Sequence, residues 1–339
     1  MGVTGFYEWL KNKGYEPKTA ILTADNSFVV DAKLMMYKIG SQIPFSCQNL
    51  ALEIAKCMDN NFARFEKEKV CFVNDGIEKI TKLKCSTAEK RKRKRQEQQD
   101  KYTVDKVNFE ELKAQRQDKD PEKKQLHDDL MFIQQEEKLE RQARYARGIS
   151  TQLSMDVLEI LKSYGYKTLQ SCAEADPVIA LMALNFDYVV SEDSDFLIYG
   201  VKNLLRHFGS KNLVFNIDEI LEQVENFNIK INLTKHQQTS KTIGKKSSSS
   251  KKFIIKYLNP KISLLQLKEM ACISGCDYSD GLNGIGMATA EKLLCKHGTI
   301  ENMIKNFTKE ELEKHAPCCN FIEIVNAVCQ LFTPQEKIN

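Results

Sequence analysis

Two pairs of acidic residues lie close together within residues 171–200. Glu174 and Asp176 form the first pair, and Asp193 and Asp195 form the second. In extended backbone, the i, i+2 spacing of each pair places both side chains on one face. A helix-like apolar run and a strand-like run separate the pairs, so folding this helix back onto its strand would bring four carboxylates together.

Four carboxylates in one small space would repel one another, so the arrangement predicts a bound cation. Carboxylate oxygens favour Mg²⁺ or Mn²⁺ over Zn²⁺ as that cation. An alternative zinc site would use Cys272, Cys276, Cys295 and His297. Their spacing is poor for zinc and Asp277 lies among them, so we expect buried structural thiols instead.

Three short apolar runs, which we expect to be strands, each lead to acidic residues. The runs are residues 27–30, 70–74 and 188–190, and they lead to Asp31, to Asp75 and to the pair Asp193 and Asp195. Amphipathic patterns predict helices over residues 3–13, 32–39, 50–67, 150–164 and 264–275. Strands that alternate with helices predict a parallel α/β sheet. In such sheets the ligand site lies beyond the carboxyl ends of the strands, where these acids stand.

Residues 85–150 differ in composition from the rest of the chain. They hold 17 Lys or Arg and 14 Asp or Glu, with few apolar anchors. Lys90–Arg95 is an unbroken basic block, which is a solvated face, a nuclear localisation signal or a DNA contact. Asp120 and Pro121 predict the start of a long helix that stops at Gly148. We expect a helical excursion above the sheet that is partly mobile without DNA.

The last third of the chain contains an insertion and a glycine turn. Residues 231–252 are low in complexity, and we expect them to be flexible. Gly284, Ile285 and Gly286 precede an apolar helical pattern, which is typical of a helix-hairpin-helix element. Such a turn aims backbone N–H groups at a phosphate.

Composition argues against secreted and membrane proteins. The chain has 339 residues, a formal net charge of +4 and 11 cysteines. The cysteines are scattered without a CxxC pair, which favours a reducing compartment. The N-terminal stretch is too short and polar for a signal peptide, and no apolar run is long enough to span a membrane. We expect an intracellular protein, in the nucleus or, for a virus, at a cytoplasmic replication site.

Six blocks of sequence, taken in order, resemble the flap endonuclease and XPG superfamily of structure-specific 5′ nucleases. The blocks are MGVTGFYEWL, FVVDAKLMMY, CFVNDG, CAEAD, SEDSDFLIYG and GCDYSDGLNGIG. Their order makes the resemblance, which covers nearly the whole chain, far more specific than one acidic pair. It implies an α/β fold with a PIN-like, mostly parallel sheet flanked by helices, a helical arch insertion and a C-terminal helix-two-turn-helix element.

The resemblance also divides the chain into five parts. These are residues 1–84 and 151–230 as the two parts of the nuclease domain, 85–150 as the charged arch, 231–252 as a flexible insertion and 253–339 as the helix-hairpin-helix DNA-binding part. The span between Asp75 and Glu174 is longer than the short arch of flap endonucleases, and the second insertion is additional.

The resemblance implies a metal site of seven carboxylates. They are Asp31, Asp75, Glu174, Asp176, Asp193, Asp195 and Asp277. At position 176 the family usually has Glu, and the shorter Asp176 could reach the metal through a bridging water. The implied chemistry is phosphodiester hydrolysis with two Mg²⁺ or Mn²⁺ ions, one activating water and one stabilising the leaving oxygen.

Further roles follow from the resemblance alone. Lys82 or Lys84, with Arg91, would contact the scissile phosphate at the base of the arch. Tyr37 would stack on a base, although a tyrosine on an apolar helix is more often a core residue. Gly2 would be a processed N-terminus beside the substrate. Gly284 and Gly286 would grip duplex DNA, with K⁺ bound at the turn.

The expected activity is cleavage of DNA with a 5′ flap, nick, gap or end, by a monomer, in replication, repair or recombination. A 5′→3′ exoribonuclease is the first alternative, and the glycine hairpin argues against it because that element grips duplex DNA. A junction-binding protein with a weakened active site is the second alternative, supported only by Asp176. Gln330, Leu331 and Phe332 do not form the box that docks flap endonucleases on the sliding clamp.

Overall fold

The chain forms two structural units, each built on parallel strands. The computed structural model describes residues 2–76, 85–117, 126–228, 261–315 and 321–331. Within these residues the first unit contains residues 2–30 and 174–331, and the second contains residues 31–76 and 85–173.

The first unit contains strands in one continuous order. This order is β1 (Lys18–Thr19), β7 (Leu213–Asn216), β6 (Asn203–Arg206), β5 (Tyr188–Val190) and β2 (Phe28–Asp31). Strands β2 and β5 are parallel, with Val30 opposite Val190. Strand β6 continues the parallel arrangement, whereas β7 and β1 pair in the antiparallel sense. The parallel strands β2 and β5 are deeply buried. Almost no surface is exposed at Phe28, Val29, Val30 and Val189, as expected for strands covered on both faces.

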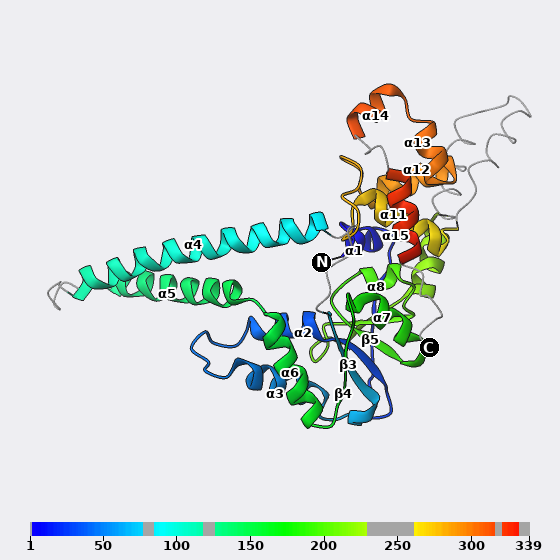
Figure 1. Ribbon diagram of the computed structural model, residues 1–339. Helices are drawn as coiled ribbons and strands as arrows, with labels where there is room; N and C mark the ends of the chain where they lie inside the picture. Colours follow the sequence, from blue (N-terminus) through cyan, green and yellow to red (C-terminus); the bar gives the residue numbers. More distant parts are fainter. Residues whose placement is uncertain (1, 77–84, 118–125, 229–260, 316–320, 332–339) are drawn as a thin grey trace, which may run out of the picture. The chain divides into compact units, whose positions relative to one another are not determined.

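Helices account for most of the rest of the first unit. They are α1 (Phe6–Asn12), α7 (Ala175–Met182), α8 (Asp195–Ile198), α11 (Leu264–Ser274), α12 (Met287–His297), α13 (Ile300–Lys305), α14 (Lys309–His315) and α15 (Phe321–Leu331). A short 3₁₀ turn (Ala183–Asn185) follows α7, and residues 217–228 are also helical. Helix α11 packs against both α12 and α15 (Figure 1).

The second unit contains the parallel pair β3 (Val70–Asn74) and β4 (Lys167–Gln170), in which Asn74 lies opposite Gln170. Its helices are α2 (Ala32–Gly40), α3 (Leu50–Phe62), α4 (Cys85–Gln117), α5 (Leu126–Arg147) and α6 (Thr151–Ser163), with a 3₁₀ turn at Lys67–Lys69. Helices α3 and α6 pack together. Three of the five strand pairings in the two units are parallel, so the expected mostly parallel α/β fold flanked by helices is confirmed.

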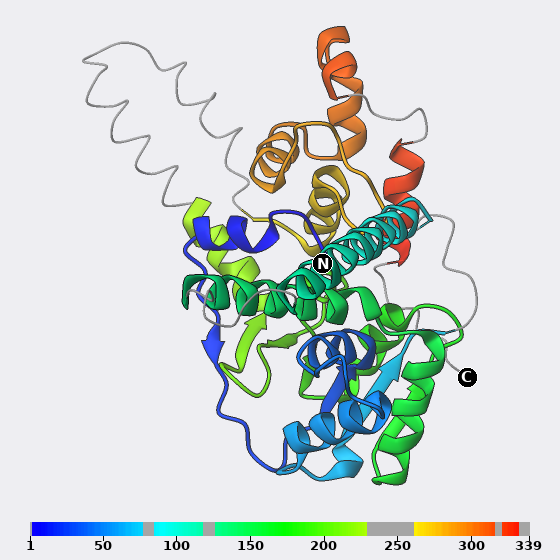
Figure 2. The same cartoon turned by 90° about the vertical axis from the view of Figure 1, so that its left-hand side faces the viewer.

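Helices α4 and α5 lie side by side as a long hairpin (Figures 1 and 2). The rings of Phe109 and Phe132 stack between them with centroids 4.7 Å apart. The amide of Gln142 donates a hydrogen bond to Asp105 over 3.0 Å. At the end of α5, Arg147 donates to the carbonyl oxygens of Gly40 and Ile43. The expected helical character is confirmed for residues 85–117 and 126–147, and α5 ends one residue before Gly148 as expected.

Two helix boundaries differ from the sequence prediction. Helix α3 ends at Phe62, five residues before the predicted end at 67, because the chain turns to bury Phe65 beside Phe62. The sequence also suggests Asp176 as the N-cap and Pro177 as the first residue of the helix that follows. Helix α7 instead begins at Ala175, with Glu174 as the residue before it, so Asp176 and Pro177 lie inside its first turn. The predicted starting residues of α5, Asp120 and Pro121, lie outside the described residues.

Candidate active site

Three carboxylates meet in the first unit. Asp193 follows β5, Asp195 begins α8, and Asp277 follows α11. One oxygen atom of each carboxylate lies within 4.8 Å of the others. Asp195 and Asp277 are buried, with 2% and 7% of their surfaces exposed, and Asp193 is partly exposed. The site therefore offers a set of oxygen ligands with one side accessible to solvent.

Local hydrogen bonds hold these carboxylates in place. The Ser191 hydroxyl accepts from the backbone N–H of Asp193 over 3.1 Å, and Asp193 Oδ1 accepts from the N–H of Asp195 over 3.0 Å. A tight turn, in which Cys276 and Ser279 exchange backbone hydrogen bonds, presents Asp277. The side chains are thus positioned by the backbone before any ligand binds.

The Asp195 carboxylate fits a cation ligand better than a structural residue. Neither of its oxygens has a hydrogen-bond partner among the described residues. Burial raises its pKa well above the usual value, and the charges of Asp193, Cys276, Asp277 and Asp176 raise it further. A buried carboxylate among other acids is costly unless a positive charge compensates it. Oxygen ligands of this kind suit a hard divalent cation.

Glu174 and Asp176 lie in the same unit, but only Glu174 has the extended backbone that the spacing suggested. Glu174 is the residue before α7 and Asp176 lies in the first turn of that helix, while Asp195 begins α8. The i, i+2 rule for strands therefore does not apply to either pair. The reason is that both pairs stand where the chain leaves an extended segment and enters a helix.

Two tyrosines, which the sequence analysis did not select, hold Glu174. The Tyr278 hydroxyl donates a hydrogen bond of 2.7 Å to Glu174 Oε2 and lies 2.9 Å from the hydroxyl of Tyr199. Burial raises the pKa of Tyr278 far above its usual value, and Tyr199, Asp176 and Glu174 add to the effect. Tyr278 therefore remains a donor at any ordinary pH. Its place directly after Asp277 was the only signal in the sequence.

Gly2 lies against Asp193 and Ser194, whereas its predicted place beside a substrate stays a prediction. Its backbone has a φ of 102°, and an added Cβ would collide with Ser194 Oγ and Asp193 Oδ1. The backbone N–H of Val3 donates to Ser194 Oγ over 2.9 Å. Only glycine fits at position 2 without moving one of these acid-site neighbours.

Asp31 and Asp75 lie in the second unit. Asp31 caps α2 by accepting a hydrogen bond of 3.0 Å from the N–H of Leu34, and 8% of its surface is exposed. Asp75 follows β3, and its carbonyl oxygen accepts from the Gln170 side chain. The structure confirms that each acid stands at the carboxyl end of a parallel strand, where ligand sites of such sheets lie.

Lys33 is a further candidate in the second unit that the sequence analysis missed. Burial lowers the pKa of its half-buried amine and Arg95 lowers it as well, whereas Asp75 and Asp31 raise it. Among the described residues, no hydrogen bond or ion pair engages its ammonium group. Lys33 therefore places a positive charge near two of the predicted metal ligands. Its position two residues after Asp31 could have indicated this.

The predicted arch and stacking residues are described only in part. Tyr37 lies on α2, half-buried, and its hydroxyl lies 3.4 Å both from the Ile149 carbonyl oxygen and from the Arg95 guanidinium. Lys82 and Lys84 lie outside the described residues. Arg91 belongs to α4, but its side chain is outside the description. Their contact with a phosphate stays a prediction.

The glycine turn precedes α12, with Gly286 as the residue before the helix. Gly284 has a φ of 70°, and an added Cβ at Gly284 or Gly286 would meet no atom within 4 Å. Both glycines are exposed, and Ile285 between them is buried. The turn thus offers open backbone on its outer side, which is compatible with the predicted approach of a phosphate.

The cysteines are not arranged as a zinc site in the described residues. Cys272 is buried and Cys276 is partly buried, but Cys295 is exposed, which corrects the expectation that all three are buried. Cys295 is exposed because it lies on the outer face of α12, whose inner face carries Ala290 and Leu294. Cys272 forms side-chain hydrogen bonds with Cys276 and Cys329, so these thiols partner one another.

Comparisons with known proteins agree with this geometry. Residues 165–277 match the family model of the XPG I-region. Flap endonuclease 1 of Glycine max is 29% identical over 185 residues, and flap endonuclease 1 of Zea mays is 24% identical over 183 residues. Each alignment covers 52% of this chain and 39% of the plant protein. The chain therefore spans about two fifths of the length of these curated relatives.

Solved structures show the same fold at low sequence identity. The catalytic core of Rad2 in complex with DNA substrate has a TM-score of 0.59 and 14% identity, with 99% of this chain and 87% of that chain covered. Flap endonuclease-1 from Methanococcus jannaschii has a TM-score of 0.50 and 14% identity, with coverage of 95% and 84%. These likenesses show that the chain shares the fold of these solved structures. Over residues 165–277 the chain is similar to the XPG I-region family, and the curated relatives that it matches are named flap endonucleases.

No helix among the described residues is long and apolar enough to cross a membrane.

Proposed function

We propose that this protein is a divalent-metal-dependent, structure-specific 5′ nuclease that hydrolyses DNA at flaps, nicks, gaps or ends. The observation that carries the proposal is the buried Asp195 carboxylate, whose oxygens face Asp193 and Asp277 without a hydrogen-bond donor among the described residues. The match to the XPG I-region, which ends at Asp277, and the relatives named flap endonuclease 1 support the same activity.

Asp193, Asp195 and Asp277 would hold the cation, with Glu174 and Asp176 nearby in the same unit. We propose two Mg²⁺ or Mn²⁺ ions, which would supply an activated water and stabilise the leaving 3′ oxygen. Asp31 and Asp75 would complete the ligand set. Chain continuity supports this for Asp31, because it directly follows Val30, and Val30 pairs with Val190 three residues before Asp193.

Each of the chain's own residues would then have a defined task. Tyr278 keeps Glu174 oriented by a hydrogen bond that does not depend on pH. Lys33, with Arg95 near it, would provide positive charge that attracts a phosphate toward Asp31 and Asp75. The turn at Gly284 and Gly286 would hold the duplex through backbone N–H groups. We also propose that this turn binds K⁺.

The proposal is tested with a labelled duplex that carries a single-stranded 5′ flap. We expect cleavage near the base of the flap in Mg²⁺ or Mn²⁺ and none in EDTA. The same oligonucleotide made of RNA tests the exoribonuclease alternative, and we expect it to be cleaved at least about tenfold more slowly. Tight binding to the flap without any cleavage would instead favour a catalytically weakened junction-binding protein.

Binding of the duplex part is expected to depend on phosphates and not on base sequence. Affinity should therefore fall as salt rises and stay unchanged when the duplex sequence is scrambled. A binding titration at several salt concentrations with two unrelated duplexes measures both properties. A strong preference for one sequence would contradict the assigned role of the glycine turn.

A further inference from the structure

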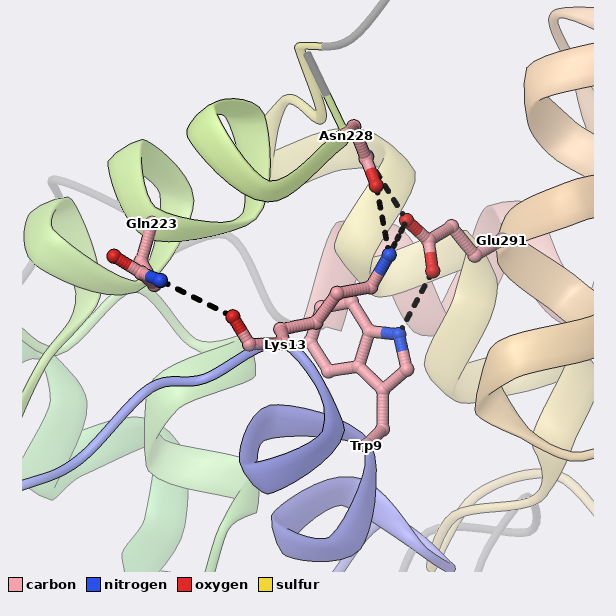
Figure 3. A network of polar contacts seen from close by, with 5 residues as sticks. All are labelled: Trp9, Lys13, Gln223, Asn228 and Glu291. Carbon is pink, nitrogen blue, oxygen red and sulfur yellow. Dashed lines mark hydrogen bonds and ion pairs between the residues drawn. The ribbon is translucent and has the colours of Figure 1, made fainter. Parts of the chain in front are cut away.

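A buried polar network joins α1 to α12 within the first unit (Figure 3). Lys13 Nζ lies 2.6 Å from Glu291 Oε1, and the indole N–H of Trp9 donates to Glu291 Oε2 over 2.9 Å. Asn228 accepts from Lys13 through its side-chain oxygen and donates to Glu291 Oε1 through its amide. Gln223 donates to the backbone carbonyl of Lys13 over 3.1 Å.

The network fixes both oxygens of one carboxylate, from Trp9 within α1 and from Lys13 directly after it. Trp9, Lys13 and Glu291 are all buried, with 3%, 8% and 6% of their surfaces exposed. The Lys13 ammonium also lies 4.9 Å from the centre of the Phe227 ring. A buried ion pair adds little net stability over apolar residues of similar size, but it does demand one geometry. The network therefore defines where the C-terminal end of α1 lies.

The other end of α1 leads to the acidic site. The backbone N–H of Val3 donates to Ser194 Oγ, and the N–H of Thr4 donates to the carbonyl oxygen of Gly275 over 3.1 Å. Ser194 lies between Asp193 and Asp195, and Gly275 precedes Asp277 by two residues. Residues 2–4 thus bridge the two segments that carry the clustered carboxylates. Helix α1 has seven residues, a rigid span of about 10 Å at 1.5 Å per residue.

Glu291 stands on the helix that the glycine turn begins. Helix α12 starts after Gly286, and Glu291 lies in its second turn. A single carboxylate therefore connects the element proposed to hold duplex DNA with α1, which is preceded by the residues Gly2 and Val3 beside Asp193 and Ser194. Among the described residues, Glu291 bonds to Trp9, Lys13 and Asn228, so this link between α1 and α12 combines charge, burial and hydrogen bonds.

We infer that Glu291 is a positioning residue for the acidic site: from α12 it holds α1, and through α1 it sets residues 2–4 between the segments of Asp193 and Asp277. This inference rests on the proposed nuclease function for its consequence in catalysis. Displacing α1 would move Gly2 and Val3 relative to Asp193 and Ser194 and disturb the carboxylate spacing that a cation requires. Duplex binding at the glycine turn would be affected much less.

The test compares substitutions that differ in charge and in length. Glu291→Gln removes the charge, whereas Glu291→Asp keeps the charge but shortens the side chain by one methylene and must pull on α1. Trp9→Phe removes only the bond to Oε2 and is a milder change if the Glu291→Gln variant folds poorly. Glu219→Gln is the matched control, because Glu219 forms a 2.6 Å ion pair with Lys18 that is exposed.

Three quantities are measured on the full chain at a temperature where circular dichroism shows every variant to be folded. They are the single-turnover rate on a saturating 5′-flap substrate, the duplex Kd, and Mn²⁺ binding by electron paramagnetic resonance without DNA. For Glu291→Gln we expect a loss of roughly ten- to a hundredfold in rate and a roughly tenfold weaker Mn²⁺ affinity. The cleavage rate and Mn²⁺ affinity of Glu291→Asp should lie between those of Glu291→Gln and those of the wild type. Trp9→Phe should lower both quantities less than Glu291→Gln does.

The duplex Kd should stay within about twofold for all variants, and Glu219→Gln should match the wild type in every measurement. A folded Glu291→Gln variant with wild-type Mn²⁺ affinity and rate would overturn the inference, as would a Glu291→Asp variant identical to the wild type. If the wild-type chain cleaves no substrate, the proposed function fails, but the Mn²⁺ titration still decides whether Glu291 positions the acids.

Discussion

The Asp195 carboxylate is buried among other acids, and none of the described residues donates a hydrogen bond to it. In the absence of a cation this arrangement should cost stability. We therefore expect Asp195→Asn to stabilise the metal-free protein by about 1–3 kcal/mol, the usual range for relieving an unsatisfied buried polar group. Thermal unfolding in EDTA measures this change.

The same variant should lose the stabilisation that a bound cation gives. Adding Mn²⁺ should raise the Tm of the wild type but have little effect on Asp195→Asn, because a ligand stabilises only a state that binds it. A lower Tm in EDTA combined with a full response to Mn²⁺ would show that Asp195 has a structural task instead.

Gly2 offers a second test at the scale of one residue. An added Cβ would collide with Ser194 and Asp193, so Gly2→Ala should lower the cleavage rate by roughly a hundredfold while duplex binding is retained. Gly5→Ala is the matched control, because Gly5 also has a positive φ but an added Cβ meets no atom within 4 Å. It should cost about 1 kcal/mol of stability without changing catalysis. Equal rates for both variants would refute the role of Gly2.

Sequence patterns predicted strands best where most residues of the strand are buried. Strand β3 matches its predicted bounds at Val70 and Asn74, and β5 matches at Tyr188 and Val190. Strands β6 and β7 were not predicted, because Asn203, Arg206 and Asn216 give them polar ends and at most two residues of each strand are fully buried. The predicted geometry of the two acidic pairs was also wrong. Their i, i+2 spacing does not reveal that, in each pair, a helix begins after the first acidic residue.

The α4–α5 hairpin has few buried contacts along its length, and Phe109 is one of them. Replacing it by Ala should open the hairpin locally, since a buried Phe to Ala change costs about 3–5 kcal/mol and nearby contacts are sparse. Hydrogen exchange in α4 and α5 should accelerate while β3 and β4 stay protected. Val107→Ala on the exposed side of α4 is the control and should leave exchange unchanged. Uniform acceleration in all elements would contradict a locally opening hairpin.

The basic block Lys90–Arg95 lies in the first part of α4, and Lys92, Arg93, Lys94 and Arg95 are exposed. Replacing the block by Gln should reduce kcat/KM on a flapped substrate by roughly tenfold or more, because a positive segment draws in a single strand. Gln at Lys101 and Lys106, farther along the same helix, is the control and should have a smaller effect. An unchanged kcat/KM would leave the block as a localisation signal or a solvated surface.

At the scale of the whole molecule, the sequence blocks indicated the superfamily before any geometry was considered. They could do so because their order along the chain is specific even where each motif is short. They could not reveal contacts that depend on tertiary packing. Glu291 and Lys33 lie in ordinary helical patterns, and only the fold shows that one is buried against Trp9 and Lys13 and that the other lies near Asp31 and Asp75.

The central claim is that the clustered acids bind the cations that cleave DNA. The most direct measurement is the single-turnover cleavage rate of a 5′-flap substrate in Mg²⁺, for the wild type and for Asp193→Ala and Asp195→Ala, with flap binding measured in parallel. We predict a metal-dependent rate for the wild type, a loss of at least about a thousandfold in both variants, and flap binding within a few-fold of the wild type. A wild-type rate in either variant would contradict the claim.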